Sequence, residues 1–262
     1  MKTLGFVIIG LIAAILILII QWKNIRKVVK YKNFPKTWRD FLKNQVPFYN
    51  HLNNNDRYRF ESDILAFLNR VKITGIDIDV DDTDRLLVAS SAVIPIFGFP
   101  EWKYYPNLDE VLLYPDTFNE KDFQTEGKER NVLGMVGSGV LNRKMILSKP
   151  ALHESFKMHG HNNVGIHEFA HLLDKMDGAT DGIPESLLGK QYIIPWMKLM
   201  HDEIQNIRSG KSDINPYGST NQQEFFAVAS EYFFQDPVHF RNKHPELYKL
   251  IDQIFHQDPY NS

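Results

Sequence analysis

The chain contains no cysteine and little net charge, and each property excludes a class of site. Without cysteine there can be no disulfide framework and no thiolate zinc site, so any zinc must be held by histidine and carboxylate side chains. The formal net charge of −2 gives no excess of positive charge for nucleic acid, so we expect no direct nucleic-acid partner. The 262 residues have an ordinary globular composition and suffice for one good-sized core or two small ones.

Long apolar runs are also scarce, but one covers residues 4–20 and contains no charged side chain. Its length is near the lower limit for a helix that spans a bilayer, and Trp22 stands where an aromatic side chain would meet the interface. A cleaved signal peptide and a buried core helix are the alternatives. No Ala-x-Ala cleavage site follows the run, and residues 15–20 are too apolar for a cleavage region. The run therefore predicts a retained transmembrane anchor over residues 1–21.

Basic residues follow this run and set its expected orientation. Only Lys2 and the α-amino group precede the run, whereas no acid follows it before Asp40. Positive charge on this flank places the following chain in the cytoplasm, and the same stretch can lie on anionic headgroups. We expect a single-pass protein of the inner (plasma) membrane, with a basic juxtamembrane segment at residues 22–44 and a cytoplasmic domain at residues 45–262. The basic residues of the flank are Lys23, Arg26, Lys27, Lys30, Lys32, Lys36 and Arg39.

The pattern beyond the juxtamembrane segment predicts an α+β fold, in which a small sheet packs on a helix and the C-terminal part is helical. Residues 41–56 are expected to form a loop or short helices, residues 72–80 a strand or an extended loop, and residues 209–216 a polar loop. The sequence predicts strands over 110–114, which end before Pro115, and over 131–136 and 144–148. Helical spacing predicts helices over 57–71 (capped by Asp56), 84–94 (capped by Thr83 and ending before Pro95), 195–207, 221–234 and 245–255.

A His-Glu-x-x-His motif lies in the apolar helical stretch of residues 165–174. His167 and His171 are four residues apart, so on a helix both imidazoles can point at one ion. Glu168 is rotated about 100° from His167 on that helix and can flank the ion without binding it. Imidazole suits zinc, which lowers the pKa of a bound water so that a carboxylate can take its proton. The motif predicts a hydrolytic Zn²⁺ site; the alternative is an ordinary amphipathic helix with two histidines.

Two histidines leave room for a third protein ligand, for which Glu224 is the best candidate. A carboxylate on a second helix is a standard way to complete such a site. Glu224 has a rival role, because its spacing from Asn221 is that of a capping box. Thr220 and Gln223 have the same spacing and better cap chemistry, so the expected cap leaves Glu224 free to bind the metal.

Two further carboxylates, Glu231 and Asp174, are weaker candidates. Glu231 shares a helix face with Glu224 but lies about 10 Å further along the axis, so one ion cannot bind both. We expect Glu231 to hydrogen-bond a neighbouring loop or a ligand histidine. Asp174, three residues after His171, is expected to be an outer-shell acceptor or a helix-end partner. Tyr217 is either a packed loop tyrosine or a donor to a developing oxyanion.

Three segments of the chain resemble the Mlc titration factor A family of zinc-dependent peptidases, and the resemblance covers roughly residues 45–260. The segment 217–227, Tyr-Gly-Ser-Thr-Asn-Gln-Gln-Glu-Phe-Phe-Ala, is also similar to the catalytic domain of anthrax lethal factor. The three segments are residues 109–115 (Asp-Glu-Val-Leu-Leu-Tyr-Pro), the pair 161–162 (His-Asn) together with the motif at 167–174, and residues 224–234 (Glu-Phe-Phe-Ala-Val-Ala-Ser-Glu-Tyr-Phe-Phe).

The resemblance implies a zincin-like, more narrowly gluzincin-like, metallopeptidase domain with aminopeptidase-type activity on a peptide or protein substrate. It implies His167, His171 and Glu224 as zinc ligands, Glu168 as general base and Tyr217 as oxyanion helper. The family's namesake also binds a transcriptional repressor of sugar uptake, but that soluble namesake lacks an N-terminal apolar run. The sequence therefore supports a membrane-anchored zinc metallopeptidase. The alternative is a membrane-tethered protein that sequesters a transcriptional regulator and uses zinc mainly structurally; an intact Glu168 favours the enzyme.

Overall fold

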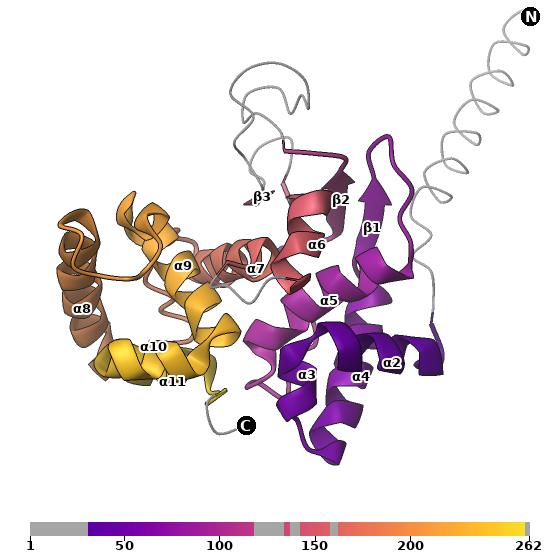
Figure 1. Cartoon of the computed structure of the whole chain (residues 1–262), viewed down its shortest axis with the longest axis horizontal. Helices are drawn as coiled ribbons and strands as arrows, with labels where there is room; N and C mark the ends of the chain where they lie inside the picture. Colours follow the sequence, from indigo (N-terminus) through magenta and orange to yellow (C-terminus); the bar gives the residue numbers. More distant parts are fainter. Residues whose placement is uncertain (1–30, 118–133, 137–141, 158–161, 260–262) are drawn as a thin grey trace, which may run out of the picture.

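The computed structural model describes residues 31–117, 134–136, 142–157 and 162–259, and these residues form an α+β fold (Figure 1). The anchor expected at residues 1–21 lies outside the described residues. Residues 22–30 of the juxtamembrane segment also lie outside them. Within the described ranges, no helix combines the length and the apolar character needed to cross a membrane.

The sheet has four strands in the order β1-β2-β4-β3. β1, β2 and β4 run parallel to one another, and β3 is an antiparallel edge strand beside β4. Neighbouring residues of a strand point to opposite faces, so Val111 and Leu113 of β2 enter the main core while Leu112 lies in a smaller cluster with Ile146. The strands are β1 (Lys72–Gly75), β2 (Glu110–Tyr114), β3 (Gly134–Val136) and β4 (Lys144–Ser148).

Strands β2 and β4 have the predicted bounds, whereas β1 covers only the first residues of the stretch 72–80. The prediction of a strand over 131–136 is confirmed for β3, and residues 131–133 lie outside the described residues. The small sheet followed by helices is therefore the layout that the apolar pattern indicated.

The N-terminal helices share the main core with the strands, and two of their predicted caps were wrong. Asn53, not Asp56, caps α4: its side chain accepts the backbone N–H of Asp56 at 3.0 Å. Asp81, not Thr83, caps α5 through a reciprocal capping box with Asp84. Asp56 in α4 and Asp84 in α5 lie inside the first turn of their helices, where a negative charge complements the helix dipole. These helices are α2 (Lys36–Gln45), α3 (Pro47–His51), α4 (Asn54–Leu68) and α5 (Asp82–Ile96).

Helix α2 falls within the stretch that the sequence analysis assigned to the juxtamembrane segment, and it contributes Trp38 and Leu42 to the main core. Two prolines also lie inside helices instead of at their predicted boundaries. Pro95 is in the last turn of α5, and Pro195 is inside α8. A proline removes one helical hydrogen bond, but the next residue of α8, Trp196, is fully buried and donates its indole N–H to the Gly182 carbonyl at 2.7 Å.

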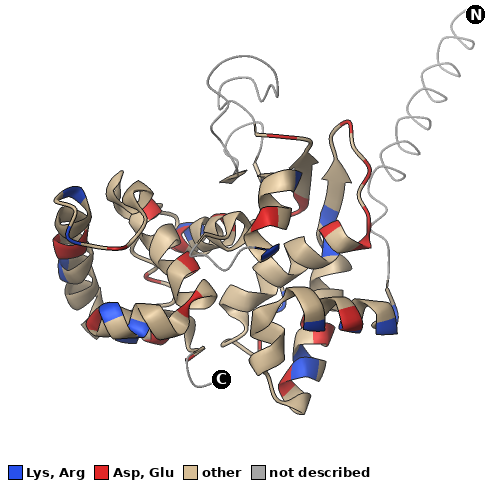
Figure 2. Ribbon diagram, viewed as in Figure 1, with Lys and Arg blue, Asp and Glu red and all other residues tan. Residues whose placement is uncertain are grey.

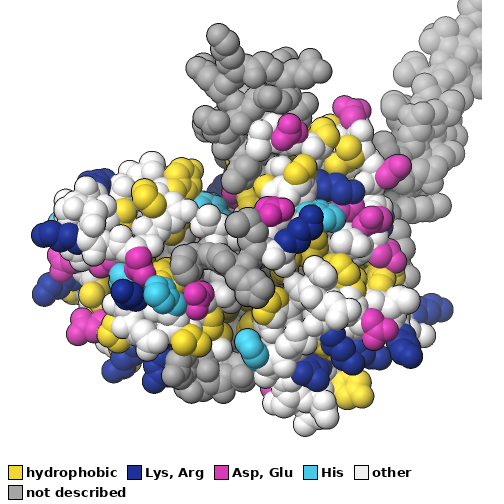
Figure 3. Space-filling model, viewed as in Figure 1, with side chains coloured by type: hydrophobic (Ala, Val, Ile, Leu, Met, Phe, Trp, Pro, Cys, Tyr) yellow, Lys and Arg dark blue, Asp and Glu magenta, His cyan; other side chains and the backbone are white. Residues whose placement is uncertain are grey.

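The C-terminal part is helical, and α7 lies at its centre. Helix α7 contacts α5 on one side, α9 on another, and strands β3 and β4 of the sheet. Acidic and basic residues are interspersed along the described helices in the ribbon of Figure 2, and exposed apolar side chains form small groups on the face drawn in Figure 3. The remaining elements are α6 (Lys149–Lys157), α7 (Val164–Asp174), η2 (Lys175–Asp177), α8 (Lys190–Arg208), η3 (Pro216–Ser219), α9 (Gln222–Gln235), α10 (Pro237–Lys243) and α11 (Pro245–Phe255).

Candidate metal centre

Helix α7 presents the His-Glu-x-x-His motif from a well-defined start. The side chain of Asn163 caps the helix by accepting the backbone N–H of Ile166 at 3.0 Å. The apolar residues of α7 are buried, and this packing holds His167 and His171 one turn apart on the face toward α9. Asn163 was not among the predicted caps, although an asparagine directly before an apolar helical pattern is a helix-start signal.

The ligating atoms of His167, His171 and Glu224 converge, and we call these three residues the ligand triad. The Nε2 atom of His167 lies 3.0 Å from Oε2 of Glu224 and 3.1 Å from Nε2 of His171. The third separation, from His171 Nε2 to Glu224 Oε2, is 3.5 Å. Bonds of about 2.0–2.2 Å to a tetrahedral zinc would separate ligand atoms by about 3.3–3.6 Å. The triad therefore has the donor atoms and nearly the spacing that such an ion requires.

Helix α9 presents Glu224 and Glu231 to α7 from the predicted segment. The expected cap by Thr220 and Gln223 was wrong, because Asn221 caps α9 by accepting the backbone N–H of Glu224 at 2.9 Å. The cap uses the backbone of Glu224, while its carboxylate turns toward α7 and contacts both histidines. Capping and metal binding are thus compatible at this residue.

Glu231 lies on the far side of the His167 ring from Glu224. Its Oε1 is 2.6 Å from Nδ1 of His167, and its Oε2 accepts the backbone N–H of Asn163 at 2.5 Å. The two contacts that were alternatives for Glu231, to a histidine of the motif and to the chain before α7, are therefore both present. A carboxylate at Nδ1 fixes the tautomer that leaves Nε2 as the metal-binding atom.

Tyr217 lies in η3, at the open side of the triad. Its ring centroid is 5.9 Å from that of His167, and the residue is 54% exposed. Asn215 accepts the Tyr217 backbone N–H and donates its own side-chain amide to Asn162, just before α7. This contact ties the loop that carries Tyr217 to the start of the motif helix.

Comparison with known proteins agrees with this arrangement. The family of glucose-regulated metallo-peptidases M90 matches residues 19–256 of the chain. The chain belongs to the M90 metallo-peptidase family. Membership in this family implies a divalent metal ion, and the ligand triad is the group among the described residues that could hold one.

The relatives confirm the resemblance to Mlc titration factor A. The Mlc titration factor A of Salmonella schwarzengrund is 28% identical over 253 residues, which is 91% of each chain. That of Klebsiella pneumoniae is 26% identical over 242 residues, 87% of this chain and 88% of the relative. An uncharacterized protein of Synechocystis is 29% identical over 256 residues, 92% of this chain and 90% of the relative.

Burial and mutual contact shift the pKa values of this M90 site in different directions. Burial lowers the pKa of His167, but the carboxylates of Glu231 and Glu224 outweigh it and hold this pKa well above 6.5. Burial raises the pKa of Glu224, and its hydrogen bonds with His167 and His171 overcome that effect and hold it well below the ordinary range. Burial also raises the pKa of Glu168 above 4.5. Glu231 and Glu224 thus favour the protonated form of His167, and a metal ion that binds at its Nε2 would have to displace that proton.

Asp174 is the last residue of α7 and does not join the triad. Its Oδ2 accepts the backbone N–H of Gly182 at 2.9 Å, so it serves as the helix-end partner that was one of its two expected roles. Burial raises its pKa to about 6. Its Oδ1 and the Nδ1 of His171 are both buried without a hydrogen-bond partner among the described residues.

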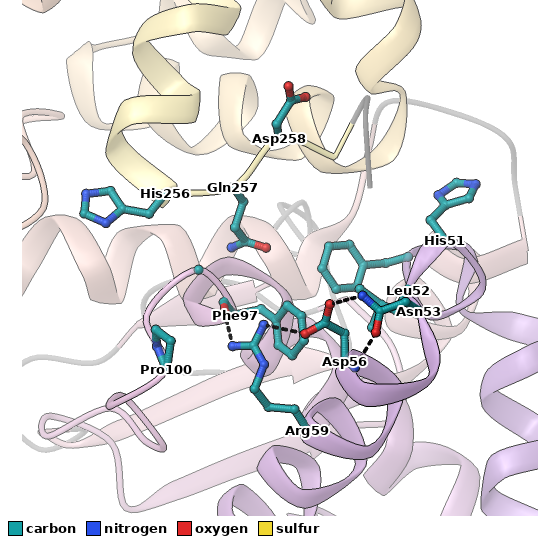
Figure 4. A pocket seen from close by; sticks show the side chains of 12 residues that line it. His51, Leu52, Asn53, Asp56, Arg59, Phe97, Pro100, His256, Gln257 and Asp258 are labelled. Atoms are coloured by element: carbon teal, nitrogen blue, oxygen red, sulfur yellow. Dashed lines mark hydrogen bonds and ion pairs between the residues drawn. The ribbon is translucent and has the colours of Figure 1, made fainter.

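A cavity of about 370 Å³ lies elsewhere, where α3, α4 and the end of α5 meet the chain after α11 (Figure 4). None of the predicted site residues lines it. Arg59 spans this cavity and donates to the Phe97 carbonyl at 2.7 Å while pairing with Asp56 at 3.3 Å. The Arg59 guanidinium therefore already has partners within the fold. The His-Glu-x-x-His motif and its candidate ligand Glu224 lie away from this cavity, on α7 and α9.

Proposed function

We propose that the protein is a zinc-dependent peptidase that hydrolyses peptide bonds, with an aminopeptidase-like preference. The observation that carries this proposal is the convergence of the ligand triad beside Glu168 in a member of the M90 family. Two imidazole nitrogens and one carboxylate oxygen form a donor set that suits zinc and leaves a position for water or substrate. A purely structural zinc site would need no buried carboxylate next to the first histidine.

Glu168 would act as the general base and then as the general acid. Zinc, when bound by the triad, supplies Lewis-acid polarisation of the substrate carbonyl and lowers the pKa of water. Glu168 takes a proton from the attacking water, whose oxygen bonds to the carbonyl carbon, and returns that proton to the leaving amine as the C–N bond breaks. Burial raises the pKa of the Glu168 carboxyl, and that direction makes its carboxylate a better proton acceptor.

Tyr217 and Glu231 would support this reaction from either side of His167. The hydroxyl of Tyr217 would donate to the oxygen that becomes negative in the transition state. Its position next to His167 and its exposure favour contact with a substrate. Glu231 would hold the His167 ring in the metal-binding tautomer through its 2.6 Å contact with Nδ1.

The reaction is tested by metal analysis and a peptide-library cleavage assay on the full-length protein in detergent, wild type beside Glu168→Gln. The variant should keep its zinc and lose about 10²- to 10⁴-fold in hydrolysis, because it removes the base and no ligand. Peptides with an acetylated N-terminus should resist cleavage if the enzyme is an aminopeptidase. Full peptidase activity in the variant would exclude this mechanism.

A second candidate function is the binding of a transcriptional regulator, and the similarity to proteins named Mlc titration factor A favours it. In this role zinc would be mainly structural. A partner that binds wild type and Glu168→Gln with equal affinity, while neither hydrolyses any peptide, would support binding as the function.

We also propose that residues 1–21 anchor the protein in the inner (plasma) membrane with the peptidase domain in the cytoplasm. The motives are the uncharged run and the basic flank after it. Two assays test this proposal. Alkaline carbonate washing of membranes tests the anchor, and treatment of cells whose inner membrane is intact with external protease tests the orientation. Release by carbonate would refute the anchor, and digestion of the domain from outside would refute the orientation.

A further inference from the structure

Edge strand β3 passes directly over the side chain of Glu168, and the residue at the crossing is Gly134. A Cβ atom placed on Gly134 would lie 2.6 Å from Cγ, 2.7 Å from Oε1 and 2.9 Å from Cδ of Glu168. Non-bonded carbon atoms at optimal separation are about 3.5–4.0 Å apart, so no larger residue fits there while Glu168 keeps its position. The strand backbone itself therefore forms the wall against which this carboxylate rests.

Backbone conformation does not explain a glycine at this position. The described glycines with a positive φ angle are Gly178, Gly182 and Gly210, and Gly134 is not among them. Gly134 is the first residue of β3, and a glycine in a strand often marks a close approach of another group. The close approach found here is that of Glu168, so the requirement at Gly134 is steric.

We propose that Gly134 is a positioning residue, whose missing side chain lets the Glu168 carboxylate lie beside the ligand triad. The inference rests on the proposed function of Glu168 as the base. The three atoms that a methyl group at Gly134 would meet most closely all belong to Glu168, so it would displace that carboxylate first. Gly134 would then set the place of the base, while the histidines and Glu224 set the place of the metal.

The two walls of this contact are fixed, so the Glu168 side chain is the part that must move. Gly134 is paired with Leu147 of β4, which is fully buried. On the other side, α7 is held by its contacts with α5 and α9, and Glu168 is only 4% exposed. Rotation of the Glu168 side chain is the least costly adjustment, and a misplacement of about 1 Å can cost about 10²-fold in rate.

The contact itself is tested by thermal unfolding of Gly134→Ala in two backgrounds, wild type and Glu168→Ala, with full-length protein in detergent. Gly134→Ala should lower the unfolding temperature in wild type. In the Glu168→Ala background the drop should vanish, because the Cγ, Cδ and Oε1 atoms that the methyl group meets are gone. Propensity effects of the glycine replacement cancel in this cycle. Equal shifts in both backgrounds would overturn the proposal.

Kinetics of Gly134→Ala test the positioning role. Turnover should fall by about 10²-fold with little change in the Michaelis constant, because a base acts mainly in the transition state. Zinc content and the visible spectrum of the cobalt-substituted protein should match wild type. Met135→Ala is the matched control, since Met135 packs with Leu112 and Ile146 in the smaller cluster; it should keep turnover within a few-fold.

These measurements separate the inference from the proposed function. If the unfolding cycle shows coupling but Glu168→Gln keeps full peptidase activity, the contact is real and the assignment of Glu168 as base is wrong. If Glu168→Gln is inactive but Gly134→Ala matches wild type in turnover, the base stands and Gly134 does not position it. Loss of zinc from Gly134→Ala would also contradict the proposal, because it would place the effect on the ligands.

Discussion

Within the part of the chain that the structure describes, the ligand triad and a second region each join two histidines to carboxylates, and they do so in different geometries. In the ligand triad, the Nε2 atoms of His167 and His171 approach each other and share one oxygen, Oε2 of Glu224. The second region, the Asp213 cluster, comprises Asp213, Glu203, Tyr232, His239 and His244. There, His239 contacts Oδ2 of Asp213 at 3.0 Å, whereas His244 contacts Oδ1 at 2.6 Å.

The difference shows that a metal site depends on convergence and not on composition. In the Asp213 cluster, each histidine has its own carboxylate oxygen, and His244 also lies 3.4 Å from Glu203. These pairwise contacts link α8, the loop before η3, α9 and α10. They do not direct three ligating atoms toward one position that an ion could occupy. Among the described residues, only the triad brings three ligating atoms within 4.8 Å of one another.

The largest expected effect is the loss of zinc when the central carboxylate of the triad is removed. Removing the central carboxylate of the Asp213 cluster provides the comparison. Glu224→Ala should lose its zinc at chelator concentrations that leave wild type loaded, and with it all hydrolysis, because two histidines alone hold the ion weakly. Asp213→Ala should keep both. Metal content after dialysis against a graded chelator series measures the outcome, and equal zinc retention in the two variants would remove Glu224 from the site.

Tyr217→Phe is expected to lower turnover by about 10²-fold, with a smaller effect on the Michaelis constant. The reason is that a donor to the developing oxyanion acts only in the transition state. Steady-state kinetics should be compared with Tyr58→Phe, an exposed tyrosine on α4 outside the site. If Tyr217→Phe and wild type have equal kinetics, Tyr217 serves only in packing.

Glu231→Gln should weaken zinc binding by about 10- to 100-fold, the usual cost of losing an outer acceptor on a ligand histidine. The variant should nevertheless stay loaded at chelator concentrations that strip Glu224→Ala, because no ligand is lost. The matched control is Glu203→Gln, which makes the same change beside His244. Competition with a chromophoric chelator measures both affinities. Unchanged affinity in Glu231→Gln would show that the Nδ1 contact does not support the ligand.

Elements with a strong local signal were predictable from the sequence. Strands β2 and β4 and helix α11 have the predicted bounds, because short apolar runs or a leading proline define them. The caps were less predictable, because several polar residues stand at each helix start and the caps are Asn53, Asp81 and Asn221. Helix α2 gave no such signal, because its basic residues suggested a membrane flank while its buried Trp38 serves the core.

The site was predictable where spacing fixes geometry and unpredictable where tertiary packing does. Four-residue spacing placed His167 and His171 on one face, and seven-residue spacing placed Glu224 and Glu231 on one face of α9. The sequence could not show that the His167 ring lies between those two carboxylates, because this depends on how α7 packs against α9. Nor could it show that Gly134, on a distant strand, meets Glu168.

The smallest expected effect concerns the Asp213 cluster, in acid. Burial raises the pKa of Asp213, but hydrogen bonds from His244 and Tyr232 outweigh it and lower the pKa from 3.8 to about 2. The unfolded chain therefore binds this proton first as the pH falls, so the stabilisation is complete above about pH 4 and is lost as the pH falls through about 2. Because the side chain is 34% exposed, solvent screening should limit the effect to about 1 kcal/mol.

Asp213→Asn should accordingly unfold less steeply with falling pH between about 4 and 2 than wild type, as measured by denaturant titrations at a series of pH values. Other acid-sensitive groups, Glu224 included, are common to both proteins and cancel in the difference. Asp40→Asn, at an exposed position on α2, is the control and should follow wild type. Parallel pH profiles for Asp213→Asn and wild type would mean that these contacts do not stabilise the fold. Zinc content should be the same in all three proteins, since a series of pairs is not a metal site.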